Sequence, residues 1–382
     1  MAATFSAADH QFMARALRLA ERGLYTTDPN PRVGCVLVRD AGVVGEGWHR
    51  KAGEAHAERI ALAAAGAAAR GATAYVTLEP CSHHGRTPPC SVGLIEAGVS
   101  RVVAAMTDPN PLVSGSGLAM LREAGIQTEV GLLHAEAAAL NPGFVQRMQY
   151  GRPFVRCKLA MSLDGRTAMA NGESRWITGE DARRDVQLLR ARSSAVLTGI
   201  GTVLADDPSL NVRLADDALF GAQGSGYRRQ PLRVVLDSRL RTPPRARMLE
   251  LPGSTLVVCG EGAPRETEEE LCSAGAEVLR LPQLGGRIDL LKLLQALAGR
   301  GVNEVLVESG PTLAGSFLQG GLVDELIVYI APHLMGHAAR GLVNLPGLEH
   351  MEQRIQLDFH DARRAGRDLR VSLRPRVRYG TA

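Results

Sequence analysis

Two short stretches constrain the fold of this chain more than any other feature: His56-Ala57-Glu58, and Pro80-Cys81 followed after eight residues by Cys90. One histidine nitrogen and two thiolates can fill three positions of a tetrahedral zinc ion and leave the fourth for water. Zinc lowers the pKa of such a water toward neutrality. The fold must therefore bring His56, Cys81 and Cys90 to one point, with Glu58 placed to carry protons rather than to bind metal.

The elements around these residues make such a convergence feasible. The stretch 56–69 is alanine-rich and predicts a helix, on which side chains two residues apart point about 200° apart. His56 and Glu58 therefore face one pocket only if they lie in the helix's first turn. Cys81 follows a β-rich run at 72–78, and Cys90 begins a helix expected over 90–97. Positions near helix starts favour the thiolate, and the whole pattern is typical of zinc-dependent nucleobase deaminases.

Other interpretations of these residues remain open from the residues alone. The cysteines could be buried side chains beside an incidental histidine. His83 or His84, between the cysteines, could supply a fourth ligand and close the site as a structural zinc, which would leave Glu58 without a role. His49 could contact a substrate or be an ordinary surface histidine.

Composition narrows the class of protein. A chain of 382 residues is too long for one ordinary core and predicts two domains, and 45% hydrophobic with 22% charged residues is typical of a globular protein. The net charge of +4 is too small to indicate nucleic acid as a partner. Only three of the 44 basic residues are lysines, which reflects either genome composition or phosphate recognition by arginine.

The cysteines and the apolar runs indicate the compartment. Six scattered cysteines are not the framework of a secreted disulfide protein. The N-terminal stretch carries Asp9 and Glu21 among apolar residues at helical spacing and does not look like a signal peptide. The run from Ile60 to Ala69 is far shorter than the ~20 residues that span a bilayer. We therefore expect a cytoplasmic protein without a membrane partner.

Alternating strands and helices predict an α/β fold in the first half. We expect an amphipathic helix over 7–23, a hairpin of strands 33–39 and 43–48, and strands at 72–78 and 101–106. The helical pattern that starts near 134 fades at Asn141-Pro142-Gly143, and Tyr150-Gly151-Arg152-Pro153 breaks it. We place the boundary there, with domains over 1–149 and 150–382, and expect the first to contain a largely parallel or mixed sheet covered on both faces.

The second half repeats the alternation. Strands are expected at 154–159, 195–199, 232–236, 256–259 and 304–308, and the polar, Gly-rich segment 215–230 as a flexible excursion. Thr178, with Asp181 three residues on, resembles a capping box that opens a helix with Ala182, Val186 and Leu189 on one face. The run 309–312 predicts a strand-to-helix turn. Leu204 stands where a G-x-G-x-x-G run from Gly199 would need its third glycine, so no Rossmann domain is expected.

The long loop between the cysteines, Pro80-Cys81-Ser82-His83-His84-Gly85-Arg86-Thr87-Pro88-Pro89-Cys90, is similar to that of the bifunctional riboflavin-biosynthesis deaminase–reductases. The tRNA and cytidine deaminases have a tighter pair. The other stretches that agree with this family are Asn30-Pro31-Arg32-Val33-Gly34, Lys158-Leu159, Ser162-Leu163-Asp164-Gly165-Arg166, Ser174-Arg175-Trp176-Ile177-Thr178, Asp206-Asp207-Pro208 and Glu308-Ser309-Gly310-Pro311. The resemblance spans nearly the whole chain and is weakest at 215–230 and beyond about 340.

This resemblance implies two reactions and two cofactors. A cytidine-deaminase-like three-layer α/β/α domain would use Zn²⁺ to hydrolyse the 2-amino group of 2,5-diamino-6-(ribosylamino)pyrimidin-4-one 5′-phosphate. A C-terminal α/β domain similar to dihydrofolate reductase would then use NADPH to reduce the ribosyl side chain and give 5-amino-6-(ribitylamino)uracil 5′-phosphate. The identity of the reductant rests on the resemblance alone.

The resemblance also implies roles for individual residues. Zinc would be held by His56, Cys81 and Cys90, with Glu58 as the proton shuttle. The deaminase substrate would contact Asn30, His49, His83, Asp108 and Asn110. The reductase substrate would contact Ser174, Arg190, Leu210, Arg213 and Glu308. The cofactor would contact Ala160, Trp176, Thr202, Asp206, Ser238 and the run Gly310, Pro311, Thr312, Leu313, Ala314, Gly315 and Ser316.

General chemistry supports part of this assignment. Two arginines suit a sugar phosphate, although Arg190 and Arg213 could instead be solvated surface residues. A glycine turn that opens a helix suits the cofactor phosphates.

Two other functions are compatible with a zinc motif. A nucleic-acid-editing deaminase would need a basic or aromatic channel for single strands, whereas aromatic residues are only 4% of this chain and the second domain would be idle. A non-catalytic zinc module would need four protein ligands and would not depend on Glu58. We therefore expect a small-molecule enzyme with no nucleic-acid partner, assembled as a homo-oligomer (a dimer or a tetramer).

Overall fold

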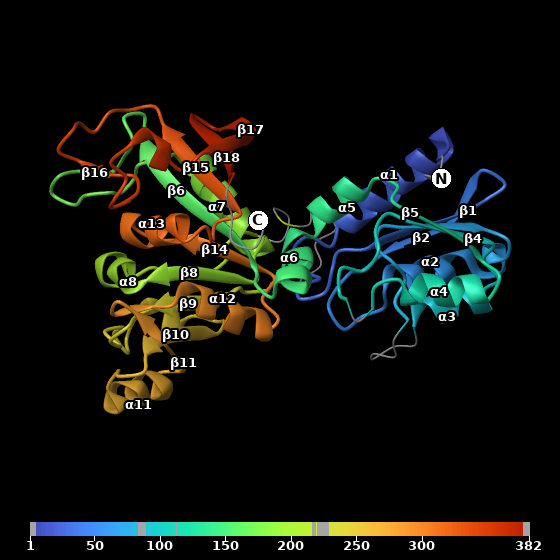
Figure 1. Ribbon diagram of the computed structural model, residues 1–382, viewed down its shortest axis with the longest axis horizontal. Helices are drawn as coiled ribbons and strands as arrows, with labels where there is room; N and C mark the ends of the chain where they lie inside the picture. The colour runs from blue at the N-terminus through green and yellow to red at the C-terminus, as the bar shows by residue number, and fades with distance from the viewer. Residues whose placement is uncertain (1–4, 83–88, 112, 216–218, 220–228, 377–382) are drawn as a thin grey trace. The chain divides into compact units, whose positions relative to one another are not determined.

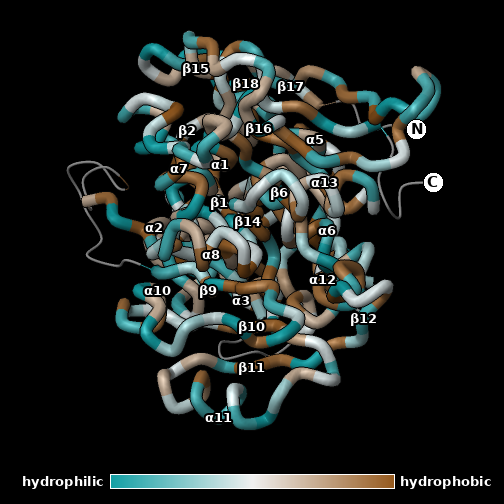
Figure 2. The backbone as a smooth tube through the Cα atoms, turned by 90° about the vertical axis from the view of Figure 1, so that its left-hand side faces the viewer, coloured by the Kyte–Doolittle hydropathy of each residue, from teal (hydrophilic) through white to brown (hydrophobic). Residues whose placement is uncertain are grey.

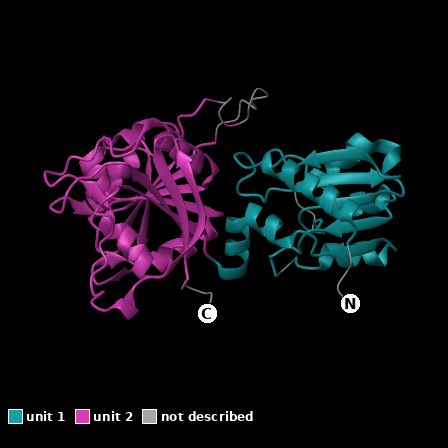
Figure 3. Cartoon of the chain, turned by 90° about the horizontal axis from the view of Figure 1, so that it is seen from above, with its two compact units in different colours: residues 1–151 teal, residues 152–382 magenta. Residues whose placement is uncertain are grey.

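The chain forms two compact units. The computed structural model describes residues 5–82, 89–111, 113–215, 219 and 229–376. Its contacts divide the chain into Met1–Gly151 and Arg152–Ala382 (Figure 3), beside the boundary expected at 149 and 150. Most of the predicted excursion at 215–230, together with His83 and His84, lies outside the described residues.

The first unit is built on a five-stranded mixed sheet in the order β2-β1-β3-β4-β5 (Figure 1). Its strands are β1 (Gly34–Arg39), β2 (Gly42–Trp48), β3 (Thr73–Val76), β4 (Arg101–Ala104) and β5 (Gln127–Val130). β1 runs antiparallel to β2 and β3, whereas β3, β4 and β5 are parallel. The carboxyl ends of β3 and β4, which lead to Cys81 and Asp108, therefore meet at one edge of the sheet.

Helices cover both faces of this sheet and make it a three-layer unit. They are α1 (Ala7–Glu21), α2 (Ala57–Ala65, followed by a 3-10 turn Gly66–Ala69), α3 (Cys90–Glu96), α4 (Ser116–Glu123), α5 (His134–Leu140) and α6 (Pro142–Tyr150). One core packs α1 and α5 on the sheet, and a second packs α2, α3 and α4 on the opposite face. The predicted fading of the helix near Asn141 is confirmed, because α5 ends at Leu140, but a further helix that was not expected begins directly after it. Pro142 occupies the first turn of this helix, α6, where its missing N–H costs no hydrogen bond.

The second unit has a nine-stranded sheet in the order β11-β10-β9-β8-β14-β6-β15-β18-β17. Its strands are β6 (Phe154–Ser162), β8 (Ala195–Gly199), β9 (Leu232–Leu236), β10 (Thr255–Gly260), β11 (Ala276–Leu281), β14 (Glu304–Glu308), β15 (Glu325–Ala331), β17 (Leu357–Ala365) and β18 (Asp368–Pro375). All neighbours from β11 to β15 are parallel, and β18 and β17 add an antiparallel edge.

The central parallel strands β8, β9 and β10 are largely apolar and buried, as strands covered on both faces should be. Figure 2 shows brown, hydrophobic stretches on strands such as β10. One face is covered by α12 (Leu290–Gly299) and α13 (Pro311–Gln319). The other is covered by α7 (Glu180–Arg192), α8 (Ile200–Asp206), α10 (Arg247–Glu250) and α11 (Arg265–Ser273). The remaining short elements are β7 (Arg166–Ala168), β12 (Gln283–Leu284), β13 (Arg287–Ile288), β16 (Arg340–Gly341) and a 3-10 turn Met351–Gln353.

The start of α7 differs from the prediction. Its buried face of Ala182, Val186 and Leu189 is confirmed, but the capping box is wrong. The helix begins one residue later than that box requires, with Gly179 at the N-cap and no side-chain cap. The Gly179 N–H instead donates to the carboxylate of Asp368, 2.7 Å away, at the start of β18. A contact 189 residues away in sequence has replaced a local one.

Membrane-crossing helices are not part of this architecture: within the described residues, no helix combines the length and the apolar character that a bilayer requires.

Candidate active sites

The three predicted zinc ligands converge in the first unit. One ligand atom from each of His56, Cys81 and Cys90 lies within 4.8 Å of the other two. His56 Nδ1 is 3.6 Å from Cys81 Sγ and 3.4 Å from Cys90 Sγ. Zinc bonds of about 2.1 Å to nitrogen and 2.3 Å to sulfur place tetrahedral N and S ligands roughly 3.5 Å apart. The donor set and its spacing therefore fit a zinc ion held by three protein ligands.

Local structure explains why these side chains meet. His56 is the N-cap of α2, with extended backbone, so its ring leaves the helix while Glu58 lies in the first turn. Cys90 is the first residue of α3, and its N–H donates to Cys81 Sγ at 3.3 Å. The Ser91 hydroxyl and N–H both donate to the Cys81 carbonyl, at 3.0 and 3.2 Å. The start of α3 thus holds the loop that carries Cys81.

The sulfur atoms carry negative charge unequally. The pKa of Cys81 is lowered to about 4, chiefly by the hydrogen bond from the Cys90 thiol and also by that from His56. The pKa of Cys90 is raised by the same bond to Cys81 and by burial. Cys81 is therefore the thiol that ionises first, and it presents an anionic sulfur to a cation.

Glu58 is placed as an acid–base group. Its side chain is only 3% exposed, and burial together with the nearby Cys81 raises its pKa to about 7. A carboxyl group that titrates near neutrality can both accept and return a proton. The carboxylate does not join the metal cluster among the described residues, which agrees with its predicted role as a shuttle.

His49 and Asn30 form one wall beside the ligands. The His49 ring is 2% exposed, so the surface-histidine alternative is wrong. Its centroid lies 5.3 Å from that of His56, nearly perpendicular to it. His49 Nδ1 donates to the Ala55 carbonyl at 3.1 Å and Nε2 accepts from Asn30 Nδ2 at 3.1 Å, and burial lowers its pKa. The ring is a neutral element that fixes the Asn30 side chain.

The loop with Asp108 and Asn110 is tied to the metal loop by a residue that sequence reasoning missed. Glu79, directly before Pro80-Cys81, is 4% exposed and accepts four backbone N–H groups. One carboxylate oxygen accepts from Asp108 (3.0 Å) and Gly115 (2.9 Å), and the other from Gly117 (2.9 Å) and Leu118 (3.3 Å). The N-cap residue of α4, Gly115, has no side chain to cap the helix. The Glu79 carboxylate caps it instead, because it accepts the N–H groups of Gly117 and Leu118 in the first turn.

The loop that leads into α4 packs closely against the backbone of the metal loop at Pro80. A Cβ at Gly117 would lie 1.9 Å from the Pro80 carbonyl oxygen, so only glycine fits there. The Ser82 and Ser116 hydroxyls are 2.6 Å apart, and the Asp108 carboxylate accepts the Asn110 N–H at 2.8 Å. Asp108 and Asn110, both partly exposed, are thus held on the same sheet edge as Cys81.

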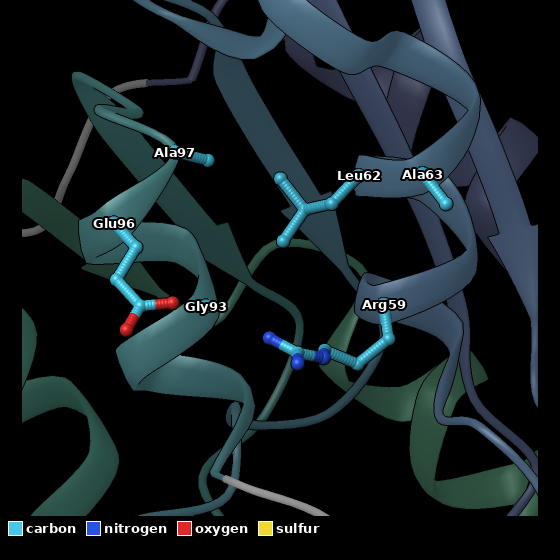
Figure 4. Close-up of a pocket in the computed structure, with 6 residues that line it drawn as sticks. All are labelled: Arg59, Leu62, Ala63, Gly93, Glu96 and Ala97. Atoms are coloured by element: carbon cyan, nitrogen blue, oxygen red, sulfur yellow. The ribbon is translucent and has the colours of Figure 1, made fainter.

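A hollow of about 500 Å³ lies elsewhere on the first unit, along the sides of α2 and α3 (Figure 4). It is lined by Arg59, Leu62, Ala63, Gly93, Glu96 and Ala97. None of these is a predicted site residue, and the chemistry described above lies at the first turns of the two helices instead.

A charged cluster marks the second unit where the middle of β6 lies beside the carboxyl end of β14. Lys158 and Glu308 are register partners on these adjacent strands. Arg190, on α7, pairs with Glu308 through two bonds, Nε–Oε1 at 2.6 Å and Nη2–Oε2 at 2.9 Å. The Arg190 side chain is 10% exposed, so the solvated-surface alternative is wrong for it. Because Glu308 occupies the guanidinium fork, Arg190 is not open to a bidentate phosphate contact.

Lys158 is the second residue that sequence reasoning left without a role. Burial lowers the pKa of its ammonium, with Glu308 opposing the shift and Arg190 adding to it. Its Nζ lies 5.9 Å from the ring centroid of Tyr329, and it makes no hydrogen bond or ion pair among the described residues. A partly buried ammonium in the middle of β6 that makes no hydrogen bond or ion pair within the described part of the chain points to a ligand. The sequence feature that could have drawn attention to Lys158 is its rarity, because it is one of three lysines in an arginine-rich chain.

The other predicted substrate residues surround this cluster. Leu210 is 2% exposed with a φ of +47°, and it precedes the Asn211 carbonyl that accepts from Arg190 at 3.1 Å. The exposed Arg213 is 2.9 Å from the Asn211 side-chain oxygen. Arg213 is therefore the arginine that remains accessible to a phosphate. Ser174 lies in the loop after β7, partly exposed.

The predicted cofactor residues follow the same sheet edge. Ala160 is on β6, Thr202 and Asp206 are on α8 after β8, Ser238 follows β9, and Gly310 is the N-cap of α13 after β14. Gly310 has no side-chain cap on α13, and a Cβ there would meet nothing within 4 Å. The nine-residue α13 therefore begins beside open space at Gly310 with no side-chain cap among the described residues, and such a helix start fits a cofactor phosphate.

The members of the predicted cofactor set differ in how far they are exposed. Ala314 is fully buried in the core, and Gly315 is packed so that a Cβ would lie 1.9 Å from the Asn344 carbonyl oxygen, so neither has surface to offer a cofactor. Trp176 is 67% exposed, with the Arg183 guanidinium 4.7 Å from its ring. Leu313 and Ser316 are partly exposed, as is Pro311, while Thr312 is exposed.

Comparisons with known proteins agree with both halves. A family model for the cytidine and deoxycytidylate deaminase zinc-binding region matches residues 6–106, and one for the RibD C-terminal domain matches residues 153–371. A riboflavin biosynthesis protein RibD from Escherichia coli is 54% identical over 370 residues, covering 96% of this chain and 99% of the relative. The chain belongs to the RibD family of riboflavin biosynthesis proteins.

Relatives and solved structures extend this result. The RibD of Bacillus amyloliquefaciens is 41% identical over 96% of each chain. Acinetobacter baumannii RibD has a TM-score of 0.88 at 48% identity, over 96% of this chain and 99% of that one. A Thermotoga maritima diaminohydroxyphosphoribosylaminopyrimidine deaminase/5-amino-6-(5-phosphoribosylamino)uracil reductase has a TM-score of 0.81 at 34% identity, over the same shares. These comparisons confirm the predicted family and the two predicted fold classes, cytidine-deaminase-like and reductase. They also confirm Zn²⁺ and NADPH as the cofactors of RibD.

Proposed function

We propose that this RibD family member catalyses two consecutive steps of riboflavin biosynthesis, first as a deaminase in residues 1–149 and then as a reductase in residues 150–382. Its substrate is 2,5-diamino-6-(ribosylamino)pyrimidin-4-one 5′-phosphate, and its product is 5-amino-6-(ribitylamino)uracil 5′-phosphate. The observation that carries the deaminase half is the convergence of His56, Cys81 and Cys90 beside the buried Glu58.

In the deaminase site, His56, Cys81 and Cys90 would hold zinc. Bound zinc supplies a Lewis acid that makes water acidic enough to deprotonate near neutral pH. Glu58 would take one proton of the attacking water and pass it to the ring nitrogen, and would then carry the second proton, from the newly formed hydroxyl, to the leaving amine, which departs as ammonia. Asn30, fixed by His49, and the loop of Asp108 and Asn110 would bind the pyrimidine and its ribosyl phosphate. His83 is proposed as a further contact.

In the reductase site, the reacting carbon is C1′ of the ribosylamine, which must open to an imine before it can accept hydride. Bound NADPH supplies the hydride. Lys158 would donate a hydrogen bond and then a proton to the substrate as the ring opens, because its ammonium lies near Glu308 and makes no hydrogen bond or ion pair among the described residues. Arg190 would hold Glu308 against the ribose hydroxyls, and Arg213 would bind the phosphate.

The setting of the enzyme is also proposed. The cysteines are all free thiols, which supports a reducing compartment, and we place the enzyme in the cytoplasm. Its partners are small molecules rather than nucleic acid or membrane. Assembly as a homo-oligomer stays a prediction that light scattering of the purified protein tests.

The test is to incubate the purified full chain with the diamino substrate, with and without NADPH, and to identify products by mass. Without NADPH, one amino group should be exchanged for oxygen and ammonia released. With NADPH, the product should also gain two hydrogens. Recovery of unchanged substrate from zinc-loaded protein in both samples would refute the proposal.

A further inference from the structure

The segment that carries Arg213 is held by two glutamine side chains to which the proposed chemistry gives no role. Gln230 lies just before β9 and binds both backbone groups of Val212. Its Oε1 accepts the Val212 N–H at 2.9 Å, and its Nε2 donates to the Val212 carbonyl at 3.1 Å. Gln187, on α7, accepts the Arg213 N–H through Oε1 at 3.0 Å. Two side chains from different elements therefore hold successive backbone groups beside Arg213.

The first half of this segment is fixed as well. Leu210 is 2% exposed and belongs to the core that packs beneath α7. The Asn211 carbonyl accepts from Arg190 Nη1 at 3.1 Å. Arg190 follows Gln187 by three positions on α7, so both side chains leave the same side of the helix. The segment 210–213 is thus tied to α7 as well as to the residue that precedes β9.

The backbone on which Gln230 stands is also bound to neighbouring elements. Arg229 Nη2 donates to the Ser193 carbonyl at 2.5 Å, and the Leu232 N–H donates to the Ser194 carbonyl at 2.9 Å. Both carbonyls lie in the short connection between α7 and β8. The amide of Gln230 therefore projects from a support that is fixed on both of its sides.

The guanidinium of Arg213 is far less constrained than its backbone. It is exposed, and its Nη1 donates to the Asn211 side-chain oxygen at 2.9 Å. Burial and then the charge of Arg190 lower the pKa of Arg213, and Glu308 opposes this shift. Arg213 thus lies within electrostatic range of the charged cluster at the end of β14, yet it forms no ion pair with a described residue. Because no acidic group holds the guanidinium, the backbone decides where it can reach.

We propose that Gln187 and Gln230 are positioning residues that aim Arg213 at the 5′-phosphate of the reductase substrate. Both act through the backbone at 212 and 213, without a contact to the substrate. A planar guanidinium binds phosphate well only in the right orientation, and a side chain on a fixed backbone loses less freedom when it binds. This inference rests on the proposed role of Arg213 and adds to it the residues that set its position.

The experiment follows NADPH oxidation by the full-length protein with two supplied substrates, 5-amino-6-(ribosylamino)uracil 5′-phosphate and the same compound without its phosphate. The ratio of the two kcat/KM values is the phosphate preference. R213Q should lower the phosphate preference by about 10- to 100-fold, the size that charge-assisted hydrogen bonds give. Q230M and Q187M keep the side-chain length but remove the amide. Each should lower the phosphate preference by about 3- to 10-fold, the size that neutral hydrogen bonds give.

The kinetic constant that changes separates positioning from a general loss of structure. In Q230M and Q187M the loss should appear in the KM of the phosphorylated substrate, while kcat and the KM values of NADPH and of the dephosphorylated compound stay at the parent's values. R213Q/Q230M should show no lower phosphate preference than R213Q alone, because no guanidinium is left to aim. Q295M is the matched control. It changes an exposed glutamine of α12 that makes no hydrogen bond among the described residues, and it should leave both substrates unaffected.

The outcomes are distinguishable. A parent-like phosphate preference in folded Q230M or Q187M would overturn the role of that residue, and additive losses in R213Q/Q230M would overturn the route through Arg213. If Q230M does not fold, Q187M and R213Q/Q187M decide in the same way, since Q187M removes one bond at a partly exposed helix position. A parent-like preference in R213Q would overturn both the phosphate role of Arg213 and the positioning. A parent protein that oxidises no NADPH with either substrate would refute the reductase function itself.

Discussion

Glu79→Gln should destabilise the first unit and loosen its substrate loop without removing a ligand of the metal site. The carboxylate of Glu79 holds four backbone N–H groups at 2.9–3.3 Å, two on each oxygen. Glutamine has the same shape but only one acceptor oxygen. Whichever way the amide is turned, two N–H groups lose their acceptor and face the amide NH₂, which is itself a donor.

The magnitude follows from the number of bonds lost. Hydrogen bonds to a charged group contribute about 1.5–3 kcal/mol each, so two of them amount to roughly 3–6 kcal/mol. A domain's whole stability is of the order of 5–15 kcal/mol. For a unit of this size each kcal/mol shifts the melting temperature by about 2–4 °C, so the first unit should melt at least about 6 °C lower. The KM of the deamination step should rise because the Asp108 N–H is one of the four groups released.

Scanning calorimetry of the zinc-loaded protein measures the shift, and NADPH oxidation with supplied intermediate reports on the second unit. Glu96→Gln is the matched control, because this exposed carboxylate on α3 accepts no hydrogen bond among the described residues and surface changes of this kind stay within about 0.5 kcal/mol. A Glu79→Gln protein that melts within 2 °C of the parent, with unchanged KM, would refute the reasoning that Glu79 assembles the deaminase loop.

Three further changes test the two sites. Cys81→Ser and Cys90→Ser should each lower the zinc content from about one per chain toward zero by metal analysis, with the exposed Cys272→Ser as control; full zinc in both variants would rule out the ligand set. Glu58→Gln should slow ammonia release by roughly 10²–10⁴-fold while zinc content and reduction of supplied intermediate persist, and deamination within about threefold of the parent would exclude the shuttle role. Lys158→Met should slow NADPH oxidation by at least about 10²-fold and leave ammonia release intact, with the exposed Lys292→Met as control; a normal rate in Lys158→Met would remove this lysine from the mechanism.

The parts of the structure that the sequence predicts well are those governed by local patterns. His56 and Glu58 could be assigned to a first helical turn because side chains two residues apart in the middle of a regular helix point to opposite sides. His56 is indeed the N-cap of α2. In the second unit the apolar runs predict β6, β8, β9, β10 and β14, whereas β11 and β15 were not expected. Cys90 at a helix start follows from the helical pattern after it, and the structure adds that its N–H reaches Cys81.

The parts that could not be predicted depend on partners far away in sequence. Nothing local shows that Glu308 neutralises Arg190 across 118 residues, so chemical type alone made both arginines look like phosphate ligands. The predicted start of α7 was wrong for the same reason. The N–H of Gly179 is bound by Asp368, on a distant strand, and not by a side chain of the predicted Thr178–Asp181 capping box. Glu79 could have been suspected, because a carboxylate directly before Pro80-Cys81 must enter the protein with the metal loop. Its four acceptor bonds become visible only when β3 and β4 are placed side by side.

Both sites are built in the same way, and this explains why their activities should be separable. In the first unit the ends of β3 and β4 bring Cys81 and the Asp108 loop together, and Glu79 joins them. In the second, the middle of β6 and the end of β14 bring Lys158 and Glu308 together, and Arg190 fixes the carboxylate. Adjacent parallel strands supply the spacing, and a buried charge bonded to a neighbouring element fixes the geometry. Because each of these contacts stays within one unit, a substitution at either site acts on its own sheet edge, and the loss of one reaction need not alter the other.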